Sequence, residues 1–533
     1  MLDWLAQRAI SRPGGIALVH GDRTWCYAEL NELVAGMAGR LASAGVEPGD
    51  HVAVLMPNRV EYVCAIHALA RLGAVLVPLN VRLTPHELRW QTDQADCTFL
   101  LCSRETQDQA SSLRIADCGL RISSSQFTIR NSGGRRVLSV DPPRESGVEA
   151  LEDYPAQVAT FRAGRRLDLE TVQGIVFTSG TTGRPKGAML TYRNHLASAT
   201  ASAFRLGTLP EDRWLACLPL YHVGGLAIIW RCCLYGTTVV LQACPERSRR
   251  DGFDAAAANQ ALDTQAITLI SLVPTMLHRV LEARGERPFP ESLRCVLLGG
   301  AAAPLALLHR SLSLGVPVAT TYGLTEAASQ VATASPADVR RKTNNPSKSS
   351  RYCVGKPLMF SSVRIVGDDG EERPVGEIGE IAVSGPTVMK GYYNQPDASA
   401  NVLRDGELYT GDMGYVDDDG DLWVVQRRFD LIVTGGENVY PAEVEEVLLE
   451  HPGVKAVCVV GVDDEEWGQR VAAAVVVAEN ATLTEDELIS FCNARLAQYK
   501  RPRVLRFVSS IPQTPSGKVL RDAVAAVFSH HER

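Results

Sequence analysis

The chain has 533 residues, more than a single hydrophobic core usually supports, so we expect two or more domains. Hydrophobic residues make up 45% and charged residues 22%, which is the composition of an ordinary soluble globular protein. The formal net charge is −7 and the sequence pI is about 5.9, which argues against a nucleic-acid binder that relies on a broad basic surface.

The sequence favours a cytoplasmic protein. An acid stands at position 3, where a secretory leader would be basic and then apolar. The longest uncharged apolar run, Trp214 to Trp230, is short and interrupted by proline, histidine and glycine, so it predicts buried core rather than a membrane span. The 13 cysteines are scattered without a Cys-x-x-Cys pair, which favours free thiols in a reducing compartment.

The first hundred residues alternate helical and strand patterns. Helical periodicity runs from Tyr27 to Val34 and from Glu61 to Arg71, and short apolar strands are predicted at His51–Met56 and Gly73–Leu79. Strands interleaved with helices predict an α/β fold with a parallel sheet. In contrast, Arg121–Gly147 mixes serine, arginine, glycine and proline with little periodicity, so we expect a surface loop or linker there.

The stretch from Phe177 to Gly187 follows a strand-like run and consists almost entirely of hydroxyl residues and glycines. Glycines let the backbone approach a ligand closely, and the hydroxyls and a lysine supply donors and a cation, which suits a triphosphate. A Walker loop is excluded because Pro185 and Gly187 flank the lysine; a plain surface loop is the alternative. The candidate phosphate-binding residues are Thr178, Ser179, Gly180, Thr181, Thr182, Gly183 and Lys186.

Three further stretches carry polar or small residues at the ends of apolar segments. Leu297–Pro304 ends a predicted strand in small residues, which leaves room beside the backbone at Gly299, Gly300 and Ala301. Thr320–Glu326 supplies an aromatic ring, a hydroxyl and a carboxylate within a few residues. Asp412 lies between glycines, where an Asx turn is the ordinary explanation. None of these stretches would be informative alone.

His222 and Arg231 are polar residues in apolar surroundings. A lone histidine in a turn such as Leu-Tyr-His-Val-Gly-Gly-Leu is more often a packed core residue than a catalyst. Arg231 lies in an apolar helical run, where a charge is costly unless it is paired. It either extends to the surface or pairs with a core carboxylate, or it binds a second carboxylate on a substrate.

From about residue 430 the pattern becomes that of a small α/β unit. Gly435 and Gly436 open a tight loop, a helix is predicted from Pro441, and Val454–Val462 is a predicted strand. Near the end of the chain, Lys518 follows Pro-Ser-Gly, where a lysine is normally a solvent-exposed cation of a turn.

These motifs together closely resemble the adenylate-forming (AMP-binding) superfamily, which contains acyl- and aryl-CoA synthetases, luciferases and the adenylation domains of peptide synthetases. The resemblance spans about residues 10 to 525, with six motifs in the family's order. It implies an α/β fold with a large N-terminal domain of several subdomains over residues 1–428. A small, mobile α+β cap over residues 429–533 would carry the catalytic lysine, with the nucleotide in the crevice between the domains.

The resemblance also implies roles for single residues. Tyr322 would stack on adenine, Thr325 would contact the α-phosphate, and Glu326 would hold Mg²⁺. Lys518 would neutralise the reacting carboxylate and the α-phosphate. The family pattern further implies nucleotide contacts at Asp412, Arg427, Gly300, Ala301, Gly435 and Gly436, and acyl-pocket contacts at His222, Arg231 and Gly299. The hinge residue is not located, because Gln426 and Phe429 depart from the usual pattern.

The implied activity is that of an AMP-forming acid–thiol ligase, with ATP and Mg²⁺ as cofactors and coenzyme A as co-substrate. We expect a standalone enzyme, because the sequence contains no carrier domain after residue 533 and no condensation module before residue 1. The expected partners are a small carboxylic acid, ATP and CoA, with no nucleic acid and no membrane span. A homodimer is left open.

For the acid, three local features resemble the o-succinylbenzoate–CoA ligases of menaquinone biosynthesis. They are the His222 motif with Trp230-Arg231 behind it, the doubled Arg427-Arg428, and the segment Gly435–Pro441. A ligase for a fatty acid or another aryl acid is the alternative. A luciferase-like oxygenase and a non-catalytic nucleotide-binding protein are the alternatives from other classes. The polar inserts have no predicted function; they lie near residues 121–147, 244–251 and 343–352.

Overall fold

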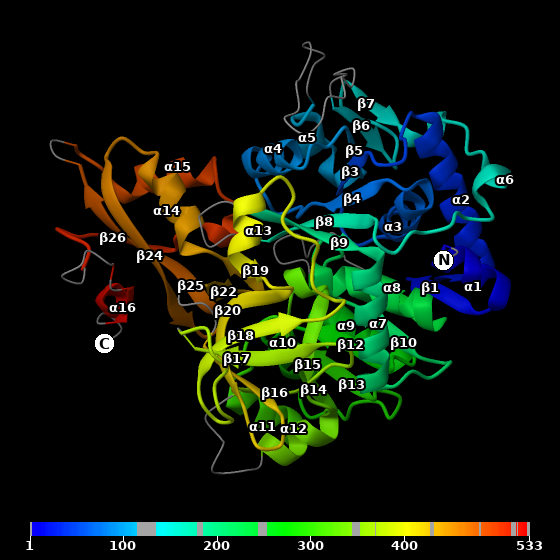
Figure 1. Cartoon of the computed structure of the whole chain (residues 1–533). Coiled ribbons are helices and arrows are strands. Elements are labelled where there is room, and N and C mark those ends of the chain that lie inside the picture. Colours follow the sequence, from blue (N-terminus) through cyan, green and yellow to red (C-terminus); the bar gives the residue numbers. More distant parts are fainter. Residues whose placement is uncertain are drawn as a thin grey trace.

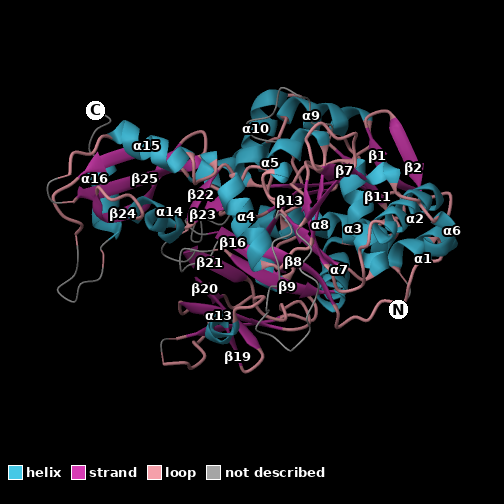
Figure 2. Cartoon of the chain, turned by 90° about the horizontal axis from the view of Figure 1, so that it is seen from above, coloured by secondary structure: helices cyan, strands magenta, loops and turns pink. Residues whose placement is uncertain are grey.

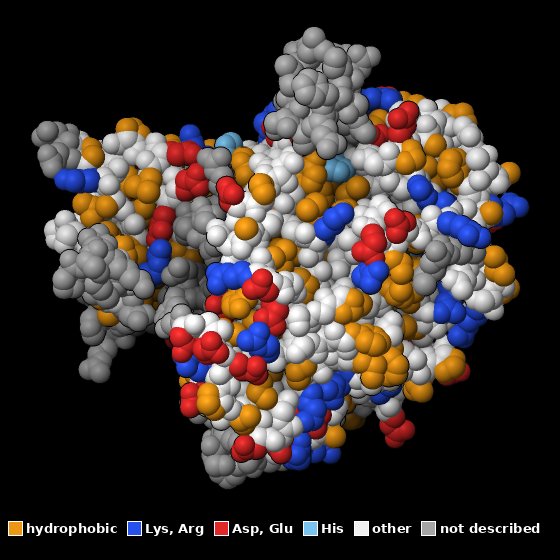
Figure 3. Space-filling view, viewed as in Figure 1, with side chains coloured by type: hydrophobic (Ala, Val, Ile, Leu, Met, Phe, Trp, Pro, Cys, Tyr) orange, Lys and Arg blue, Asp and Glu red, His pale blue; other side chains and the backbone are white. Residues whose placement is uncertain are grey.

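The structure is a computed structural model. It describes residues 3–114, 135–178, 185–242, 253–343, 352–367, 369–426, 431–478, 481–512, 519 and 521–529, and these ranges contain three β-sheets with helices packed against them (Figures 1 and 2). The cysteines in this part of the chain are free thiols. On the face shown in Figure 3, basic and acidic side chains are interspersed rather than gathered by sign.

A seven-stranded sheet occupies the blue and cyan part of Figure 1 and confirms the predicted parallel α/β pattern. Its order is β7-β6-β5-β3-β4-β8-β9, and every neighbouring pair is parallel except β8 with β9. Its helices include α2 (Tyr27–Ser43), α3 (Val60–Leu72) and α4 (Pro85–Gln94). The strands are β3 (His51–Leu55), β4 (Val75–Pro78), β5 (Phe99–Cys102), β6 (Arg136–Ser139), β7 (Val148–Ala150), β8 (Val172–Thr178) and β9 (Lys186–Thr191).

The prediction of a loop or linker over Arg121–Gly147 is wrong for part of that segment. Arg136–Ser139 forms strand β6, which pairs in parallel with β5, and the side chains of Val137 and Leu138 are fully buried. A strand of four residues that begins with arginine is too short to show a clear alternation. Residues 115–134, the first part of the insert, lie outside the described residues, as do residues 243–252 and most of the insert near 343–352.

The largest sheet is mixed, and its two halves meet at strand β14 (Val318–Leu324). The first half of β14 pairs in parallel with β13, up to Thr320, and its second half pairs antiparallel with β15, from Thr321 onward. The second half of β14 therefore extends beyond the end of β13, and its residues face a space that the parallel strands do not fill.

The large sheet has the order β17-β18-β20-β21-β16-β15-β14-β13-β12-β10-β11-β1-β2, with β19 beside β20. Its first strands are β1 (Ile16–His20), β2 (Arg23–Cys26), β10 (Arg213–Ala216), β11 (Thr238–Leu241), β12 (Leu269–Leu272) and β13 (Cys295–Leu298). The others are β15 (Ser329–Thr333), β16 (Tyr352–Pro357), β17 (Ser362–Val366), β18 (Gly379–Ser384), β19 (Leu403–Arg404), β20 (Glu407–Val416) and β21 (Leu422–Gln426).

Helices cover the two large sheets. The apolar helix α8 (Val223–Tyr235) carries Arg231 and confirms the helix predicted around that residue. The other helices are α1 (Trp4–Ser11), α5 (Gln107–Ser111), α6 (Val158–Phe161), α7 (Tyr192–Leu206), α9 (Ala255–Thr264), α10 (Pro274–Arg284), α11 (Leu305–Ser313), α12 (Pro336–Thr343) and α13 (Pro396–Val402).

The described residues from 431 onward form a separate small sheet with its own helices, drawn in orange and red in Figure 1, which we call the C-terminal unit. The sheet has the order β23-β22-β25-β24, with β26 beside β25, and confirms the predicted helix at Pro441 and the strand from Val454. Its elements are β22 (Ile432–Thr434), β23 (Glu437–Val439), α14 (Pro441–Leu449), β24 (Val454–Asp464), β25 (Gly468–Val477), α15 (Glu485–Asn493), β26 (Val504–Phe507) and α16 (Arg521–Ser529).

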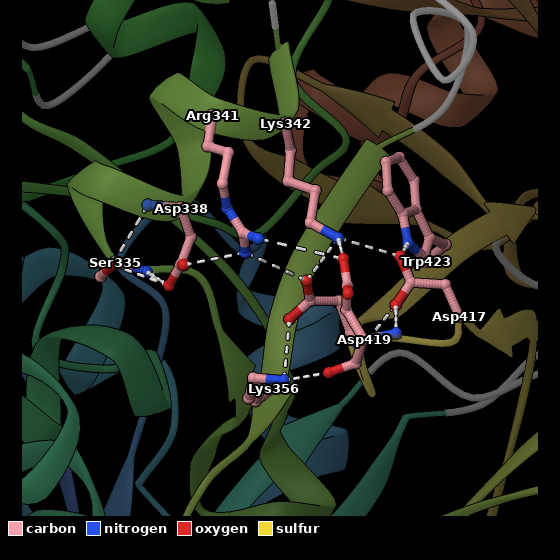
Figure 4. A network of polar contacts seen from close by, with 9 residues as sticks. Ser335, Asp338, Arg341, Lys342, Lys356, Asp417, Asp419 and Trp423 are labelled. Atoms are coloured by element: carbon pink, nitrogen blue, oxygen red, sulfur yellow. Dashed lines mark hydrogen bonds and ion pairs between the residues drawn. The ribbon is translucent and has the colours of Figure 1, made fainter. Parts of the chain in front are cut away.

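Helix α12 is held against the β20–β21 hairpin by a buried lysine (Figure 4). The ammonium group of Lys342 lies 3.0 Å from Asp417 Oδ2, 2.6 Å from Asp419 Oδ2 and 2.8 Å from Asp421 Oδ2. The side chains of Lys342 and Asp421 are only 6% and 1% exposed. The three carboxylates could together hold a metal ion, but the ammonium group already occupies the position between them. The network holds the turn that follows β20, the strand that carries Asp412.

We expect Lys342→Met to destabilise the fold, because it removes the cation nearest to the buried Asp417 and Asp421. The next cation, Lys356, lies 3.8 Å from Asp421. Losing one partner of a buried ion pair costs about 3 kcal/mol or more, so the urea unfolding curve should shift to lower denaturant. The control is Arg341→Met, whose side chain is 58% exposed and should cost less than about 1 kcal/mol. Equal shifts for the two variants would contradict this account.

Candidate active site

A cavity of about 1640 Å³ is lined by residues from all three sheets. The end of β8, the loops after β4, β12 and β13, the second half of β14 and the start of the C-terminal unit supply its walls. Most of the described candidate residues line it: Thr178, His222, Arg231, Gly299, Gly300, Thr325, Glu326, Asp412, Gly435 and Gly436. Ser179, Gly180, Thr181, Thr182, Gly183, Arg427 and Lys518 lie outside the described residues.

One wall of the cavity brings the predicted phosphate-binding strands to the predicted magnesium ligand. Thr178 ends β8 and is paired in the sheet with Lys186, which begins β9. The hydroxyl of Thr178 donates to Glu326 Oε1 at 3.3 Å, and the Tyr392 hydroxyl donates to the same oxygen at 2.7 Å. The Lys186 ammonium lies 5.3 Å from the centre of the Tyr392 ring. Two hydroxyls therefore hold one carboxylate, and a cation lies over the aromatic ring that carries one of these hydroxyls.

The predicted adenine and ribose residues also meet. Tyr322, on β14, donates its hydroxyl proton to Asp412 Oδ2 on β20 at 2.7 Å. The Tyr322 side chain is 2% exposed and does not line the cavity, so its stacking on adenine stays a prediction. Asp412 lies within a strand rather than in the Asx turn that its glycine neighbours suggested.

Two glycines after β13 leave the backbone open to the cavity. A Cβ on Gly299 would lie 2.6 Å from Thr321 Cγ2, which is closer than side chains pack. Gly300 adopts a positive φ of +82° and borders Val273, so a side chain there would be strained. Ala301 follows them without lining the cavity.

Arg231 is the most unusual side chain of the site. It is 1% exposed, so it does not extend to the surface, and no described residue forms an ion pair with it. One guanidinium nitrogen donates to Ser329 Oγ at 3.3 Å, the ring of Trp214 lies 5.6 Å away, and the buried Nε has no hydrogen-bond partner among the described residues. Burial lowers the pKa of the guanidinium, whose high ordinary value keeps it charged.

The neighbouring backbone supports the placement of Ser329. Its φ is +100° and that of Ala328 is +50°, a strained conformation for residues with a side chain. The strain turns the chain directly after Glu326, so that the Ser329 hydroxyl reaches Arg231 in the wall of the cavity. Ser329 was not among the candidate residues, because backbone strain leaves no signal in the sequence.

Contacts across the cavity mouth join the C-terminal unit to the rest of the chain. Glu437 accepts from His222 at 3.1 Å and from Arg82 at 3.0 Å, and a Cβ on Gly436 would lie 2.8 Å from Val273 Cγ2. Burial alone would raise the pKa of Glu437, but His222 and Arg82 outweigh it and lower the pKa to about 2. Glu437 lies in the segment Gly435–Pro441 but was not itself a candidate, and Arg82 was missed because its partner is far away in the sequence.

Comparison with known families decides what kind of site this is. The family model described as AMP-binding enzyme matches residues 5–393, and that of the AMP-binding enzyme C-terminal domain matches residues 443–518. The chain belongs to the AMP-binding enzyme family. The predicted superfamily and fold are thereby confirmed, whereas the boundary between residues 428 and 429 stays a prediction.

Within this family, the chain is 43% identical to 2-succinylbenzoate–CoA ligase of Geobacillus kaustophilus, over 98% of this chain and 96% of the relative. It is also similar to the structure of a double mutant of Bacillus subtilis o-succinylbenzoate CoA synthetase bound to the product analogue OSB-NCoA. The TM-score is 0.83 at 35% sequence identity, and the match covers 99% of this chain and 98% of the other. For the same B. subtilis enzyme with the acyl-adenylate OSB-AMP, the TM-score is 0.68 at 36% identity, with 98% of each chain covered. In the described part of this chain, no helix is both long and apolar enough to cross a membrane.

Proposed function

We propose that this chain is a 2-succinylbenzoate–CoA ligase (2-succinylbenzoate is o-succinylbenzoate) that works through an acyl-adenylate intermediate. Relatives that carry this name match nearly the whole chain at 40% to 43% identity. The observation that carries the substrate assignment is Arg231, a buried guanidinium at the cavity wall with no acidic partner among the described residues. A substrate with a second carboxylate supplies that partner.

In the first half-reaction, one substrate carboxylate attacks the α-phosphorus of ATP and pyrophosphate leaves. Both reactants are anions, so the protein must offset their repulsion. Glu326 would hold Mg²⁺, which prefers oxygen ligands and neutralises phosphate charge, and its hydroxyl neighbours on Thr178 and Tyr392 orient its carboxylate. We infer that the loop over residues 178–183, Lys186 and Lys518 act on the same phosphates, as the family motifs imply.

Arg231 and Ser329 form the site for the second carboxylate. Together they offer guanidinium N–H groups and a hydroxyl at one point of the cavity wall. An unpaired buried charge is costly, and the cost is recovered when a carboxylate binds. A fatty acid or benzoate has only the carboxylate that is adenylated, so it would leave Arg231 unpaired.

In the second half-reaction, the CoA thiolate forms a bond to the acyl carbon, the bond from that carbon to the phosphate oxygen breaks, and AMP leaves. His222 borders the acyl part of the cavity and is 42% exposed, so it can gate access to the adenylate. ATP, CoA and free cysteines are compatible with the cytoplasm, where we place the enzyme. Whether it forms a homodimer stays an open prediction.

We expect Arg231→Leu to abolish the preference for 2-succinylbenzoate. Loss of a buried charge-assisted contact should lower kcat/KM for this acid by about 100-fold, and kcat/KM for benzoate should change little. Acid-dependent pyrophosphate release with Mg-ATP and CoA, measured for both acids and for octanoate, checks this. Arg213→Leu is the control, since that guanidinium binds the Gln265 carbonyl away from the cavity. A wild-type preference for a monocarboxylic acid would contradict the substrate assignment.

Glu326→Gln should weaken magnesium binding without unfolding the site. Glutamine still accepts from the Tyr392 hydroxyl but lacks the charge that attracts the cation. We expect the Mg²⁺ concentration for half-maximal pyrophosphate release to rise at least about tenfold. Glu380→Gln is the control, because that carboxylate binds the Gly411 amide and does not line the cavity. An unchanged magnesium dependence in Glu326→Gln would exclude this role.

Lys518→Ala should separate the two half-reactions. The resemblance implies that this lysine acts only while both carboxylate and triphosphate are bound. Pyrophosphate release is therefore expected to be lost, whereas conversion of supplied acyl-adenylate and CoA to the thioester persists. If both activities fall equally, the separate role is wrong.

A further inference from the structure

A second set of buried charges joins the C-terminal unit to helix α4, and one of its members, Lys500, lines the cavity. The Lys500 ammonium lies 2.8 Å from Glu87 Oε1 and 2.6 Å from Glu443 Oε1. The side chains of Lys500, Glu87 and Glu443 are 3%, 9% and 8% exposed. Glu87 belongs to α4, whereas Lys500 and Glu443 belong to the C-terminal unit, so we call this triad the latch. In Figures 1 and 2, α4 lies on the side of the molecule that faces the C-terminal unit.

Each half of the latch is held in place by its own unit. Glu87 completes the capping box of α4, where its Oε2 accepts from the backbone N–H and the hydroxyl of Thr84, each at 2.8 Å. Its Oε1 remains for Lys500. Lys500 in turn is paired with Glu443, and although burial alone would lower its pKa, Glu443 and Glu87 raise the pKa well above the ordinary value. The bond from Glu87 to Lys500 is therefore the part that depends on how the two units are oriented.

Other contacts along the same edge favour the same orientation. The Thr84 hydroxyl oxygen lies 3.0 Å from the Arg495 carbonyl oxygen, and the Asn80 amide donates to the Tyr499 hydroxyl at 3.4 Å. A few residues away, Arg82 meets Glu437 at 3.0 Å. Residues 80–87 thus form one docking edge for the C-terminal unit.

This orientation suits acyl transfer better than adenylation. It brings the anionic Glu437 beside His222 in the wall of the cavity where the acid and ATP would bind. In this orientation Arg82 and His222 are paired with Glu437 rather than with a bound anion, which suits the step after pyrophosphate has left better than the step that joins two anions. The chain also has a higher TM-score with the B. subtilis enzyme bound to a CoA product analogue than with its acyl-adenylate complex.

We propose that Glu87 and Lys500 are positioning residues for acyl transfer to CoA. They hold the C-terminal unit in the orientation in which the Gly435–Glu437 loop borders the acyl pocket, and they take no part in forming the adenylate. The proposal rests on the proposed two-step ligase function and adds residues that lie outside its motifs. Neither the phosphate-binding motif nor the Lys518 motif contains them.

The test compares Glu87→Gln with a matched control. Glutamine keeps the volume and can still close the α4 capping box, and Lys500 stays paired with Glu443, so the variant should fold. The control is Glu487→Gln, because Glu487 closes the capping box of α15 with Thr484 in the same way and lies exposed. Lys500→Gln and the double variant complete a double-mutant cycle with Glu87→Gln.

Two half-reactions are measured separately in single turnovers: pyrophosphate release with acid and Mg-ATP, and thioester formation from synthetic acyl-adenylate and CoA. We expect Glu87→Gln to slow thioester formation roughly tenfold while pyrophosphate release stays within about twofold. The double variant should be no slower than Lys500→Gln alone. Equal losses in both half-reactions, a loss in pyrophosphate release alone, or no loss would each overturn the proposal.

A second measurement does not depend on activity. Hydrogen exchange of the Gly435–Tyr440 amides should be at least about threefold faster in Glu87→Gln than in the wild type or Glu487→Gln, because the docked orientation is less populated. Unchanged exchange would contradict the latch even if the acid proves to be a different one. If the wild-type enzyme releases no pyrophosphate with any acid, the proposed ligase function is wrong. The hydrogen-exchange result still shows whether Glu87 and Lys500 hold the C-terminal unit in its docked orientation.

Discussion

The arrangement of this enzyme depends on how buried charges are paired around one cavity. Glu437 is paired with His222 and Arg82, Lys500 with two glutamates, and Lys342 with three aspartates. These pairs link elements that are far apart in sequence, and a misplacement of either partner would leave a charge in a medium of low dielectric. Arg231 stands in contrast, because its charge is as deeply buried but has no carboxylate partner among the described residues. A site that lacks only an anion is what a dicarboxylic substrate requires.

Sequence patterns predicted the elements that repeat a simple period. The helices α2 and α3 and the strands β3 and β4 were found because apolar residues recur at helical or strand spacing. Strand β6 was missed because it has four residues and begins with arginine, so that its buried pair, Val137 and Leu138, is too short to show a period. Short interior strands are recognised by the strands they pair with in the sheet, and the local sequence does not show which strands those are.

The candidate site was predictable to the extent that its residues lie in compact motifs. Glu326 closely follows β14, Asp412 lies on β20 and His222 precedes α8, and all three side chains line the cavity. The link from Tyr392 to Glu326, the strained turn at Ser329 and the partner of Glu437 could not be predicted, since each depends on where distant strands come together. Motifs therefore identified the reacting groups, and the fold revealed what holds them.

The two half-reactions make opposite electrostatic demands on the same space. Adenylation joins two anions and needs cations near the phosphates, as Lys186 and the magnesium ligand Glu326 would provide. Acyl transfer starts when the pyrophosphate charge has gone, and it tolerates Glu437 in the cavity wall. One rigid arrangement does not suit both demands, because Arg82 is paired here with Glu437, whereas adenylation needs cations that face the phosphates. Placing the variable charges on a separate C-terminal unit, docked by contacts at residues 80–87, lets one cavity serve both steps.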